Sequence, residues 1–480
     1  MREDELPEGW TVLGIDQLCH RVTDGTHFSP KEQNRRGGFK YVTAKNIREW
    51  GLDLSDVTYV SEAIHRPIFQ RCNPEKDDVL YIKDGATAGI AILNPLQEEF
   101  SLLSSVALLK PDRSRLDPSF LKWYLMSPVG RRAMLDQVTG SAITRLTLEI
   151  IRGSEVPTPP LPEQKRIVAK VDELLACVNA ARERLERVHA VLKRFRQAVL
   201  AAACDGRLTE DWRAGRPACD GWQRRTLGSL LREPLRNGHS ARASADGRGV
   251  RTLTLSAVTY GDFSPKNTKM TIAEPSRVRD LWLQPGDILI ERSNTPELVG
   301  TSRLYRGPAR FAIFPDLVIR ARVTEKEALP PFVEIVLQTQ AARRFFMDNA
   351  QGSAGTMPKI DQGVIERFEF DLPGIAEAAE VVRRVEALFK LADAIEKRVA
   401  TSTARAEKLT QAILAKAFRG DLVPTEAELA RREGRTYETA LALLERLSLG
   451  REHMDEASKR TLVDEGHPRH ANGNRLRKEG

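Results

Sequence analysis

Apolar residues recur along residues 162–208 at alternating steps of four and three positions, with polar residues between them. This spacing is the a/d pattern of a coiled coil, and a strict seven-residue repeat implies left-handed supercoiling. The pattern therefore predicts one long helix with a single apolar seam. Its seam positions are Ile167, Val171, Leu174, Val178, Ala181, Leu185, Val188, Leu192, Phe195 and Val199.

The same frame returns in the second half of the chain, within residues 373–422, where a constant offset carries each seam position of the first copy onto one of the second. Smaller residues occupy three of its seam positions, Ala392, Ser402 and Ala406, so larger side chains of the first helix can lie against them. Two helices that share one frame are expected to pack against each other. The other seam positions of the second helix are Val381, Val385, Leu388, Ile395, Val399, Leu409 and Ile413.

Each helical stretch spans about 40 residues, which at about 1.5 Å rise per residue makes a rod on the order of 60 Å long. An amphipathic helix lying on a globular core is the usual source of such a stripe. A rod of this length exceeds a single core, however, and its other positions are mostly Lys, Arg, Glu and Ala, as expected for faces in water. We therefore expect a two-helix coiled coil.

The duplication continues outside the helices, although most residues between the shared landmarks differ. A Trp followed by Leu-Gly opens both halves, an acidic residue precedes an apolar strand in both, and an Arg-Arg pair precedes Gly-Ser-Ala in both. The landmarks are Trp10 and Trp222, Leu13-Gly14 and Leu227-Gly228, Asp78-Val79-Leu80 and Asp287-Ile288-Leu289, Arg131-Arg132 and Arg343-Arg344, and Gly140-Ser141-Ala142 and Gly352-Ser353-Ala354. The order along the chain is domain, helix, domain, helix.

A chain of 480 residues exceeds one ordinary core, and we expect two loop-rich domains, two helices, and a final helical hairpin with a disordered polar tail. Short apolar strands bounded by turn residues, with a few helices, indicate an α+β fold in each domain. The five segments are 1–160, 161–204, 205–372 (with a linker at its start), 373–422 and 423–480. The expected strands are 39–43, 78–82, 106–109, 252–255 and 287–290, and the expected helices lie near 118–125 and 331–346.

The net charge of +8 suggests a nucleic-acid partner, but the distribution of charge weakens this argument. Residues 1–160 hold 20 Lys and Arg against 22 Asp and Glu, and residues 220–372 hold 22 against 18. DNA binding would then depend on local basic clusters, because phosphate contacts require cations at particular places. The clusters are Lys31, Arg35, Arg36 and Lys40 in the first domain and Arg303, Arg306 and Arg310 in the second. Taken alone, either cluster is more typical of a solvated face.

Five scattered cysteines without CxxC spacing indicate reduced thiols and neither disulfides nor a zinc site. The first ten residues contain no apolar stretch, and no part of the chain approaches the roughly 18 consecutive apolar residues of a membrane span. We therefore expect a cytoplasmic protein without membrane association.

Motifs for catalysis are missing from the sequence. No Gly-Lys pair occurs, which excludes an ordinary P-loop, and the Asn-Pro pairs at Asn73 and Asn94 do not continue into the Asn-Pro-Pro-aromatic sequence expected for amino-methylation. His467 and His470 have no further ligand at metal-site spacing. The segment Asp24–His27 has no nucleophile to pair with and is better explained as a turn with a contact histidine. We expect neither catalytic nor metal-binding residues in this chain.

Several segments resemble the specificity subunits of type I restriction-modification enzymes, over a range from Leu6 to about Leu449. The Pro-Leu-Pro-Glu-Gln entry to a long helix is the most specific of them. In the second copy Asp371–Val382 reads DLPGIAEAAEVV, so we expect no counterpart of Glu163-Gln164 and an altered partner contact there. The matching segments are LPEGW at Leu6–Trp10, DGTH at Asp24–His27, PPLPEQKRIVAKVDEL at Pro159–Leu174, GRLTEDWR at Gly206–Arg213 and FRGDLVPTEAELARREGRTYETALALLERL at Phe418–Leu447.

This resemblance implies a pseudo-two-fold molecule in which two target recognition domains are separated by two long antiparallel helices. Each domain would read one half of a bipartite double-stranded DNA site, and helix length would set the gap between the halves. The chain itself would be non-catalytic and would bind no cofactor. Two modification subunits that use S-adenosylmethionine would dock along the helices, and restriction subunits that use ATP and Mg would join them.

Because the two domains share a frame and differ in their loops, we expect an asymmetric target. Arg and Lys read guanine, and Asn and Gln read adenine, in the major groove. The candidate loop residues are Thr26, His27, Lys31, Arg35, Lys45, Asn46, Lys83 and Arg145 in the first domain, and Asn237, Lys266, Asn267, Arg292, Asn294, Thr295, Arg303 and Lys359 in the second. Two alternatives stay open: a specificity subunit of a related type II-like restriction-methylation enzyme, and a coiled-coil scaffold without a role in DNA binding.

Overall fold

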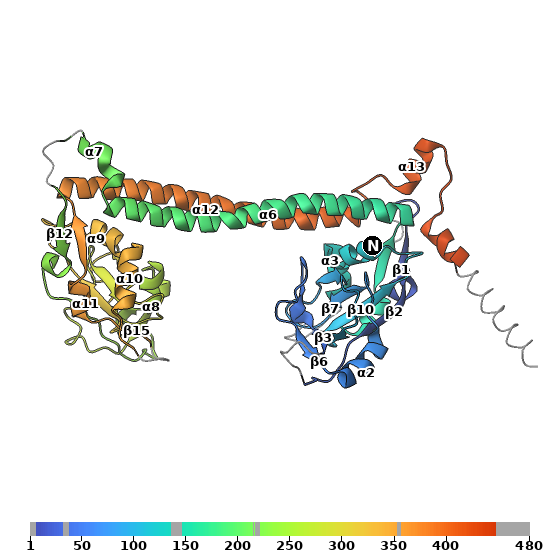
Figure 1. The fold of residues 1–480 in the computed structure, drawn as a ribbon, viewed down its shortest axis with the longest axis horizontal. Coiled ribbons are helices and arrows are strands. Elements are labelled where there is room, and N and C mark those ends of the chain that lie inside the picture. The colour runs from blue at the N-terminus through green and yellow to red at the C-terminus, as the bar shows by residue number, and fades with distance from the viewer. Residues whose placement is uncertain are drawn as a thin grey trace, which may run out of the picture. The chain divides into compact units, whose positions relative to one another are not determined.

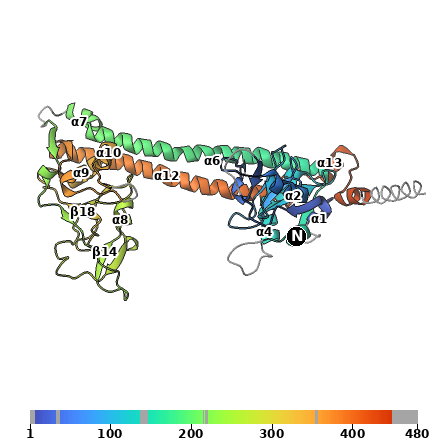
Figure 2. The ribbon, with the colours of Figure 1, turned by 60° about the horizontal axis from the view of Figure 1, so that its bottom comes forward.

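The structure is a computed structural model that describes residues 6–31, 38–135, 146–214, 216, 221–352 and 357–447. It contains two compact units, Met1–Glu183 with Thr403–Gly480, and Arg184–Ser402. Each unit combines one domain of helices and short strands with parts of two long helices, α6 (Leu161–Cys204) and α12 (Ile375–Ala417), which Figure 1 and Figure 2 show. The predicted α+β class with two long helices is confirmed. The candidates Arg35 and Arg145, together with Arg36, His467 and His470, lie outside the described residues.

A four-stranded antiparallel sheet forms the centre of the first domain, in the order β2 (Cys19–Asp24), β10 (Val106–Pro111), β7 (Val79–Ile82), β8 (Ala91–Leu93). Side chains alternate between the two faces of the sheet. Val79 and Tyr81 join an apolar cluster with α3 (Pro118–Met126) and the start of α6, while Leu80 and Ile82 join a separate cluster. Because both faces are covered, β7 is apolar at every position.

The shorter elements of the first domain surround this sheet. Asp117 caps α3, its carboxylate accepting hydrogen bonds from the amides of Ser119 and Phe120. The remaining elements are the pair β1 (Thr11–Gly14) and β11 (Glu155–Thr158), the sheet β6 (Thr58–Val60), β3 (Phe39–Val42), β9 (Ser101–Leu102), the hairpin β4 (Ile47–Arg48) and β5 (Gly51–Leu52), and the helices α1 (Ile15–Leu18), η2 (Ala44–Asn46), α2 (Glu62–Cys72), α4 (Pro128–Leu135) and α5 (Leu148–Gly153).

The second domain repeats this arrangement. Its central sheet has the order β13 (Arg236–Asn237), β18 (Val318–Ala321), β16 (Ile288–Glu291), β17 (Ser302–Leu304), again antiparallel throughout. The remaining elements are the pairs β12 (Gln223–Thr226) with β19 (Glu369–Leu372) and β14 (Val250–Leu253) with β15 (Thr268–Thr271), and the helices η4 (Gly228–Leu230), α8 (Leu255–Tyr260), η5 (Pro265–Asn267), α9 (Pro330–Leu337), α10 (Gln340–Asp348) and α11 (Gln362–Glu366).

A buried ion pair at the base of the central sheet shows how closely the two frames agree. Asp78 precedes β7 and pairs with Lys110 at 2.7 Å, and Asp287 precedes β16 and pairs with Arg322 at 2.5 Å. Lys110 lies in β10, the strand next to β7, and Arg322 directly follows β18, the strand next to β16. The two domains therefore share equivalent strands and equivalent side-chain pairs.

The long helices run antiparallel in each unit. In the second unit Arg196 of α6 donates to Asp393 (2.7 Å) and Glu396 (2.8 Å), whereas Asp211, beyond the end of α6, pairs with the earlier residue Arg384 of α12. In the first unit the start of α6 meets the segment that follows α12, which contains α13 (Glu426–Glu433) and a helical stretch at 440–447. The segment that follows α6 contains η3 (Arg207–Thr209) and α7 (Glu210–Ala214).

Burial along the predicted seam is uneven. Leu174, Leu185, Val188, Phe195 and Leu388 are half-buried. Four seam positions contradict the prediction, because Ala181, Ile395, Ser402 and Leu409 are exposed. A pair of helices covers only one side of each partner, so a long side chain at the border of the contact keeps one face in water. The buried seam residues are Ile167, Val171, Val178, Leu192, Val199, Val381, Val385, Ala392, Val399 and Ile413.

Candidate nucleic-acid interface

In each domain an edge strand of the central sheet ends in a turn that only glycine permits. A Cβ on Gly25, after β2, would lie 1.9 Å from a carbonyl oxygen of β9, and one on Gly238, after β13, would lie 2.1 Å from the carbonyl oxygen of Pro315. These distances exclude a side chain, so the backbone of one segment passes closely over another. The two glycines therefore form the same turn, preceded by Asp24 in the first domain and by Asn237 in the second.

In each domain a second strand of the central sheet ends at the same edge as the strand before the glycine turn. Strands β2 and β7 both pair antiparallel with β10, so they point the same way, and β13 and β16 do so beside β18. Lys83 follows β7 and Arg292 follows β16, and their carbonyl oxygens accept 2.9 Å hydrogen bonds from the amides of Leu146 and Ile360. We call this edge the strand-end site. Its segments are Asp24–His27 and Lys83 in the first domain, and Asn237-Gly238, Arg292–Thr295 and Lys359 in the second.

The first strand-end site is organised by the buried carboxylate of Asp24. It pairs with Arg71 of α2 at 2.8 Å, with His27 Nε2 at 3.1 Å and with Lys83 Nζ at 3.7 Å. Lys83 is itself buried and also pairs with Asp84 at 3.0 Å. The prediction that Lys83 is exposed to DNA is therefore wrong. His27 and Arg71 are half exposed and remain able to meet a ligand.

Thr26 also departs from the expectation of an exposed contact. Its side chain is buried, and its hydroxyl accepts a hydrogen bond from the Phe28 amide at 3.3 Å. Arg71 had not been a candidate, because it lies 47 residues from Asp24 and no local spacing connects the two. Only the packing of α2 against the sheet brings its guanidinium to this site.

The second strand-end site carries different side chains on the same backbone. Asn237 Oδ1 accepts from Gln362 Nε2 at 3.2 Å, and Asn294 Nδ2 donates to Glu291 at 2.6 Å. Burial raises the pKa of the Glu291 carboxyl. Lys359 and Thr295 are exposed and Arg292 is half-buried. Among the described residues, no carboxylate lies within ion-pair distance of Arg292 or Lys359, so both cations are available to an anionic ligand.

Two asparagines proposed to read bases have structural roles. Asn46 is buried, its Oδ1 accepts from the Thr43 amide at 3.0 Å, and its Nδ2 donates to the carbonyl of Asp53 at 3.2 Å. Asn267 donates to Asp262 at 2.8 Å. Buried polar groups are normally bonded within the protein, and a sequence pattern does not distinguish such an asparagine from a reading one. Their neighbours Lys45 and Lys266 are exposed, as is Lys31.

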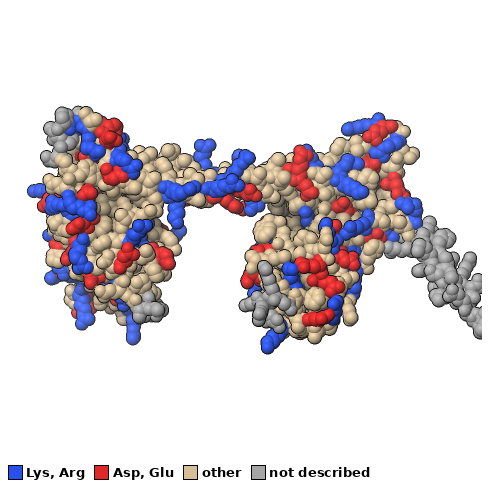
Figure 3. Space-filling model, in the orientation of Figure 1, with Lys and Arg blue, Asp and Glu red and all other residues tan. Residues whose placement is uncertain are grey.

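The basic cluster of the second domain is also partly structural. Arg303 donates to the carbonyl of Ser302 at 2.8 Å, and burial lowers the pKa of its guanidinium. Arg306 pairs with Glu334 at 2.8 Å, and Arg310 lies over the ring of Trp282 at 5.4 Å. Figure 3 shows Lys and Arg interspersed with Asp and Glu over both domains on the face drawn. The electrostatic field is thus local, as the charge counts predict.

Glu163 and Gln164 have both side chains buried inside the first unit. Glu163 accepts from Trp10 Nε1 at 2.8 Å and from the Glu426 amide at 2.7 Å. Gln164 accepts from the Asp117 amide at 2.8 Å. The two residues attach the first domain and the segment after α12 to the start of α6.

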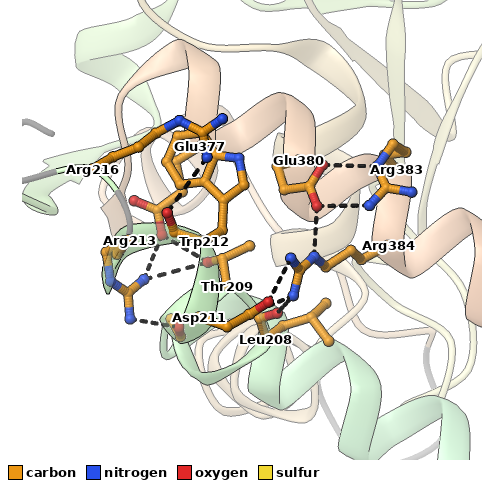
Figure 4. Close-up of polar contacts among 11 residues, drawn as sticks. Leu208, Thr209, Asp211, Trp212, Arg213, Arg216, Glu377, Glu380, Arg383 and Arg384 are labelled. Carbon is orange, nitrogen blue, oxygen red and sulfur yellow. Dashed lines mark hydrogen bonds and ion pairs between the residues drawn. The ribbon is translucent and has the colours of Figure 1, made fainter.

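The expectation that the second helix has no counterpart of Glu163 is wrong. Glu377 is buried and accepts hydrogen bonds from Thr209 (2.7 Å) and from Arg213, as Figure 4 shows. The offset that aligns the two seams also aligns Glu377 with Glu163, although the sequences around them look unrelated. Gln164, by contrast, is replaced by the buried Ala378.

A wider polar network surrounds Glu377 at the start of α12. Arg384 donates to Asp211 at 2.6 Å, to the carbonyl of Leu208 at 2.9 Å and to Glu380 at 2.6 Å. Arg383 also pairs with Glu380, at 2.7 Å. Residues from η3 and α7 are thereby attached to the first turns of α12, as the segment after α12 is attached to α6.

Comparison with known proteins agrees with this architecture. The family described as type I restriction modification DNA specificity domain matches residues 7–190. The type I restriction enzyme EcoKI specificity subunit of Escherichia coli (strain K12) is 32% identical over 428 residues, which cover 88% of this chain and 91% of the relative. The StySPI specificity subunit of Salmonella potsdam is 30% identical over 427 residues, with the same coverage.

The chain belongs to the specificity subunits of type I restriction-modification systems.

Solved structures support the fold of this specificity subunit. A chain from a structural study of complex assembly and conformational transition in the type I R-M system has a TM-score of 0.66 at 21% identity and covers 87% of this chain and 99% of its own length. The HsdS subunit from Thermoanaerobacter tengcongensis has a TM-score of 0.51 at 20% identity, covering 87% and 98%. Within the residues that the structure describes, no helix is long and apolar enough to span a membrane.

Specificity subunits recognise DNA as part of a larger complex and are not themselves catalytic, and this chain is such a subunit. The buried carboxylate of Asp24 holds the side chains of His27 and Arg71, which suits contact with a polar surface. The histidine that the turn motif singled out therefore fits a contact residue.

Proposed function

We propose that each domain of this specificity subunit reads one half of an asymmetric, bipartite DNA site through its strand-end site. The supporting observation is that the two sites share a backbone and differ in side chains. His27 and Arg71 face outward in the first, whereas Arg292, Thr295 and Lys359 do so in the second. Arginine and lysine distinguish bases by hydrogen bonding in the major groove, so unlike side chains at one place specify unlike half-sites.

The two long helices are proposed to set the gap between the half-sites and to dock the other subunits. Exposed apolar side chains on them, including Val191, Leu391 and Leu409, fit this role. The proposed partners are two modification subunits using S-adenosylmethionine, and restriction subunits using ATP and Mg. No cofactor is proposed for this chain, and the proposed location is the cytoplasm, where chromosomal DNA is available.

Exchange of residues 10–150 for the same domain of another family member tests the proposal. The exchanged chain and the unaltered chain are each expressed with the methyltransferase of this system, and methylated positions are mapped across the genome. We expect one half of the target to change while the other half and the gap stay the same. The reciprocal control exchanges residues 223–372 and should change the opposite half. A change in both halves after either exchange would contradict independent reading.

A further inference from the structure

Two aromatic side chains are unusually exposed. Among the residues that the structure describes, no large hydrophobic side chain is more exposed than Trp50 (74%) and Tyr260 (77%). Aromatic residues bury a large area with little loss of conformational freedom and are enriched at the centres of protein interfaces. One lies in each domain, and neither belongs to a strand-end site.

The two aromatics occupy nearly the same place in the duplicated frame. Phe39 pairs with Val60 across β3 and β6, and in the second domain Val250 pairs with Thr271 across β14 and β15. Val60 follows Phe39 by the same number of positions as Thr271 follows Val250, so the connection between the two strands has the same length in both domains. Trp50 and Tyr260 lie near the middle of this connection, and their places in it differ by a single position.

Trp50 lies in the turn between β4 and β5, and Tyr260 is the last residue of α8, so both aromatic residues stand where an element of the connection ends. Ile47 and Val258 hold the same position in the two connections, are fully buried, and anchor the connections to their domains. A glycine follows each aromatic residue, and Gly51 (φ +144°) and Gly261 (φ +69°) both adopt backbone conformations that side chains disfavour. The aromatic rings are thus held outward before any partner binds, which reduces the entropy lost on association.

A feature shared by both domains points to a partner that is the same at both. The half-sites of the target differ, whereas two copies of one protein subunit would meet each half of the chain in the same way. The charges beside the aromatics are mixed: Glu49 lies 3.9 Å from Arg131 in the first domain, and Arg303 packs against Gly261 beside the exposed Asp262 in the second. Mixed charge around an aromatic centre is typical of a protein interface rim and less suited to a phosphate backbone.

A cavity beside Tyr260 supports the same conclusion. It has a volume of about 600 Å³, and Val382 and Phe389 of α12 line its other wall together with Glu386. A partner that covers Tyr260 can therefore also reach a long helix within the second unit. We infer that Trp50 and Tyr260 are equivalent anchors for two identical protein subunits, which, if the proposed function holds, are the two methyltransferase subunits.

The test measures how many methyltransferase subunits of the same system assemble with the full-length chain, by native mass spectrometry and titration. Trp50→Ser and Tyr260→Ser should each weaken one of the two binding events roughly thirtyfold, the size expected for an interface anchor, and leave a complex with one tightly bound subunit. The double variant should weaken both. Trp50→Tyr, which places the residue type of the second domain in the first, should retain both subunits.

Matched controls separate an anchor from a merely exposed apolar side chain. Phe28→Ser (57% exposed) and Ile272→Ser (63% exposed) remove exposed side chains from the same two domains and should keep both subunits. Binding of two subunits with unchanged affinity by Trp50→Ser and Tyr260→Ser would overturn the inference. Complete assembly with loss of DNA retention would also overturn it and would assign the aromatics to DNA. Because this readout is stoichiometry, it is independent of the half-site change that tests the proposed function.

Discussion

Glu163 and Glu377 occupy the same position near the start of the two long helices, and each is covered by the segment that follows the other helix. Glu163 accepts from the amide of Glu426, beyond α12, and Glu377 accepts from Thr209 and Arg213, beyond α6. This relationship repeats in two units that differ in almost every loop. It joins the start of each long helix to the segment that follows the other helix.

Glu163→Ala should lower the free energy of unfolding by about 1–3 kcal/mol, because the buried indole N–H of Trp10 and the amide of Glu426 would lose their acceptor. Urea denaturation followed by tryptophan fluorescence measures the loss. Glu173→Ala in the same helix is the control, since Glu173 is exposed and forms a surface pair with Lys170. Equal stability of the two variants would show that the buried contact is dispensable.

Glu377→Ala should destabilise the second unit by about 3 kcal/mol, because it leaves the guanidinium of Arg213 without the buried carboxylate that it contacts. Glu377→Gln retains an acceptor for Thr209 and should cost less. The exposed Glu386, in the same helix, provides the control variant Glu386→Ala. Calorimetry of the full chain measures these effects, and an unchanged unfolding temperature for Glu377→Ala would refute the structural role.

Glu291→Gln should change how stability depends on pH. Burial raises the pKa of Glu291 above its usual 4.5, so between these values the folded state binds a proton that the unfolded state releases. The unaltered chain should therefore lose stability relative to Glu291→Gln as the pH rises from 4.5 through the raised pKa. Glu297, whose pKa is lowered by a backbone hydrogen bond, should show the opposite trend in Glu297→Gln. Urea denaturation at a series of pH values measures both differences.

Arg292→Gln and Lys83→Gln should behave differently although both positions follow equivalent strands. Arg292 has no carboxylate partner among the described residues, so its replacement should weaken or alter recognition of the second half-site by about 1–3 kcal/mol and leave the first unchanged. Lys83 is buried against Asp24 and Asp84, so its replacement should chiefly lower stability. Methylation mapping together with thermal unfolding distinguishes the two outcomes.

Insertion of four residues beside Arg196 in α6, with four beside Asp393 in α12, should lengthen the gap between half-sites. These residues pair at 2.7 Å, so a double insertion keeps the two helices in step. One added turn is about 6 Å, which corresponds to roughly one to two base pairs. Both half-sites should stay the same. The same four residues placed in the exposed loop after Arg248 should leave the gap unchanged, and an unchanged gap in the helix variant would mean that the helices do not set it.

The arrangement of elements was largely predictable because it follows from local periodicity. The seven-residue repeat locates both helices, and the Asp78 and Asp287 landmarks locate equivalent strands, since hydrophobic spacing reflects how a helix or a strand faces its core. The reading residues were less predictable. Asn46 and Lys83 have the residue types of DNA contacts, but their side chains are satisfied inside the protein. Whether a polar side chain points inward depends on distant segments.

From sequence alone, the duplication, the helix frame and the type of fold are determined, because each depends on residues that are near one another in the chain. Only the tertiary structure decided that Glu163 and Glu377 are equivalent buried acceptors, that Arg71 joins Asp24, and that Trp50 and Tyr260 are both exposed. These facts depend on contacts between segments tens to hundreds of residues apart. Burial and hydrogen bonding across such separations assign each polar side chain to the interior or to a partner.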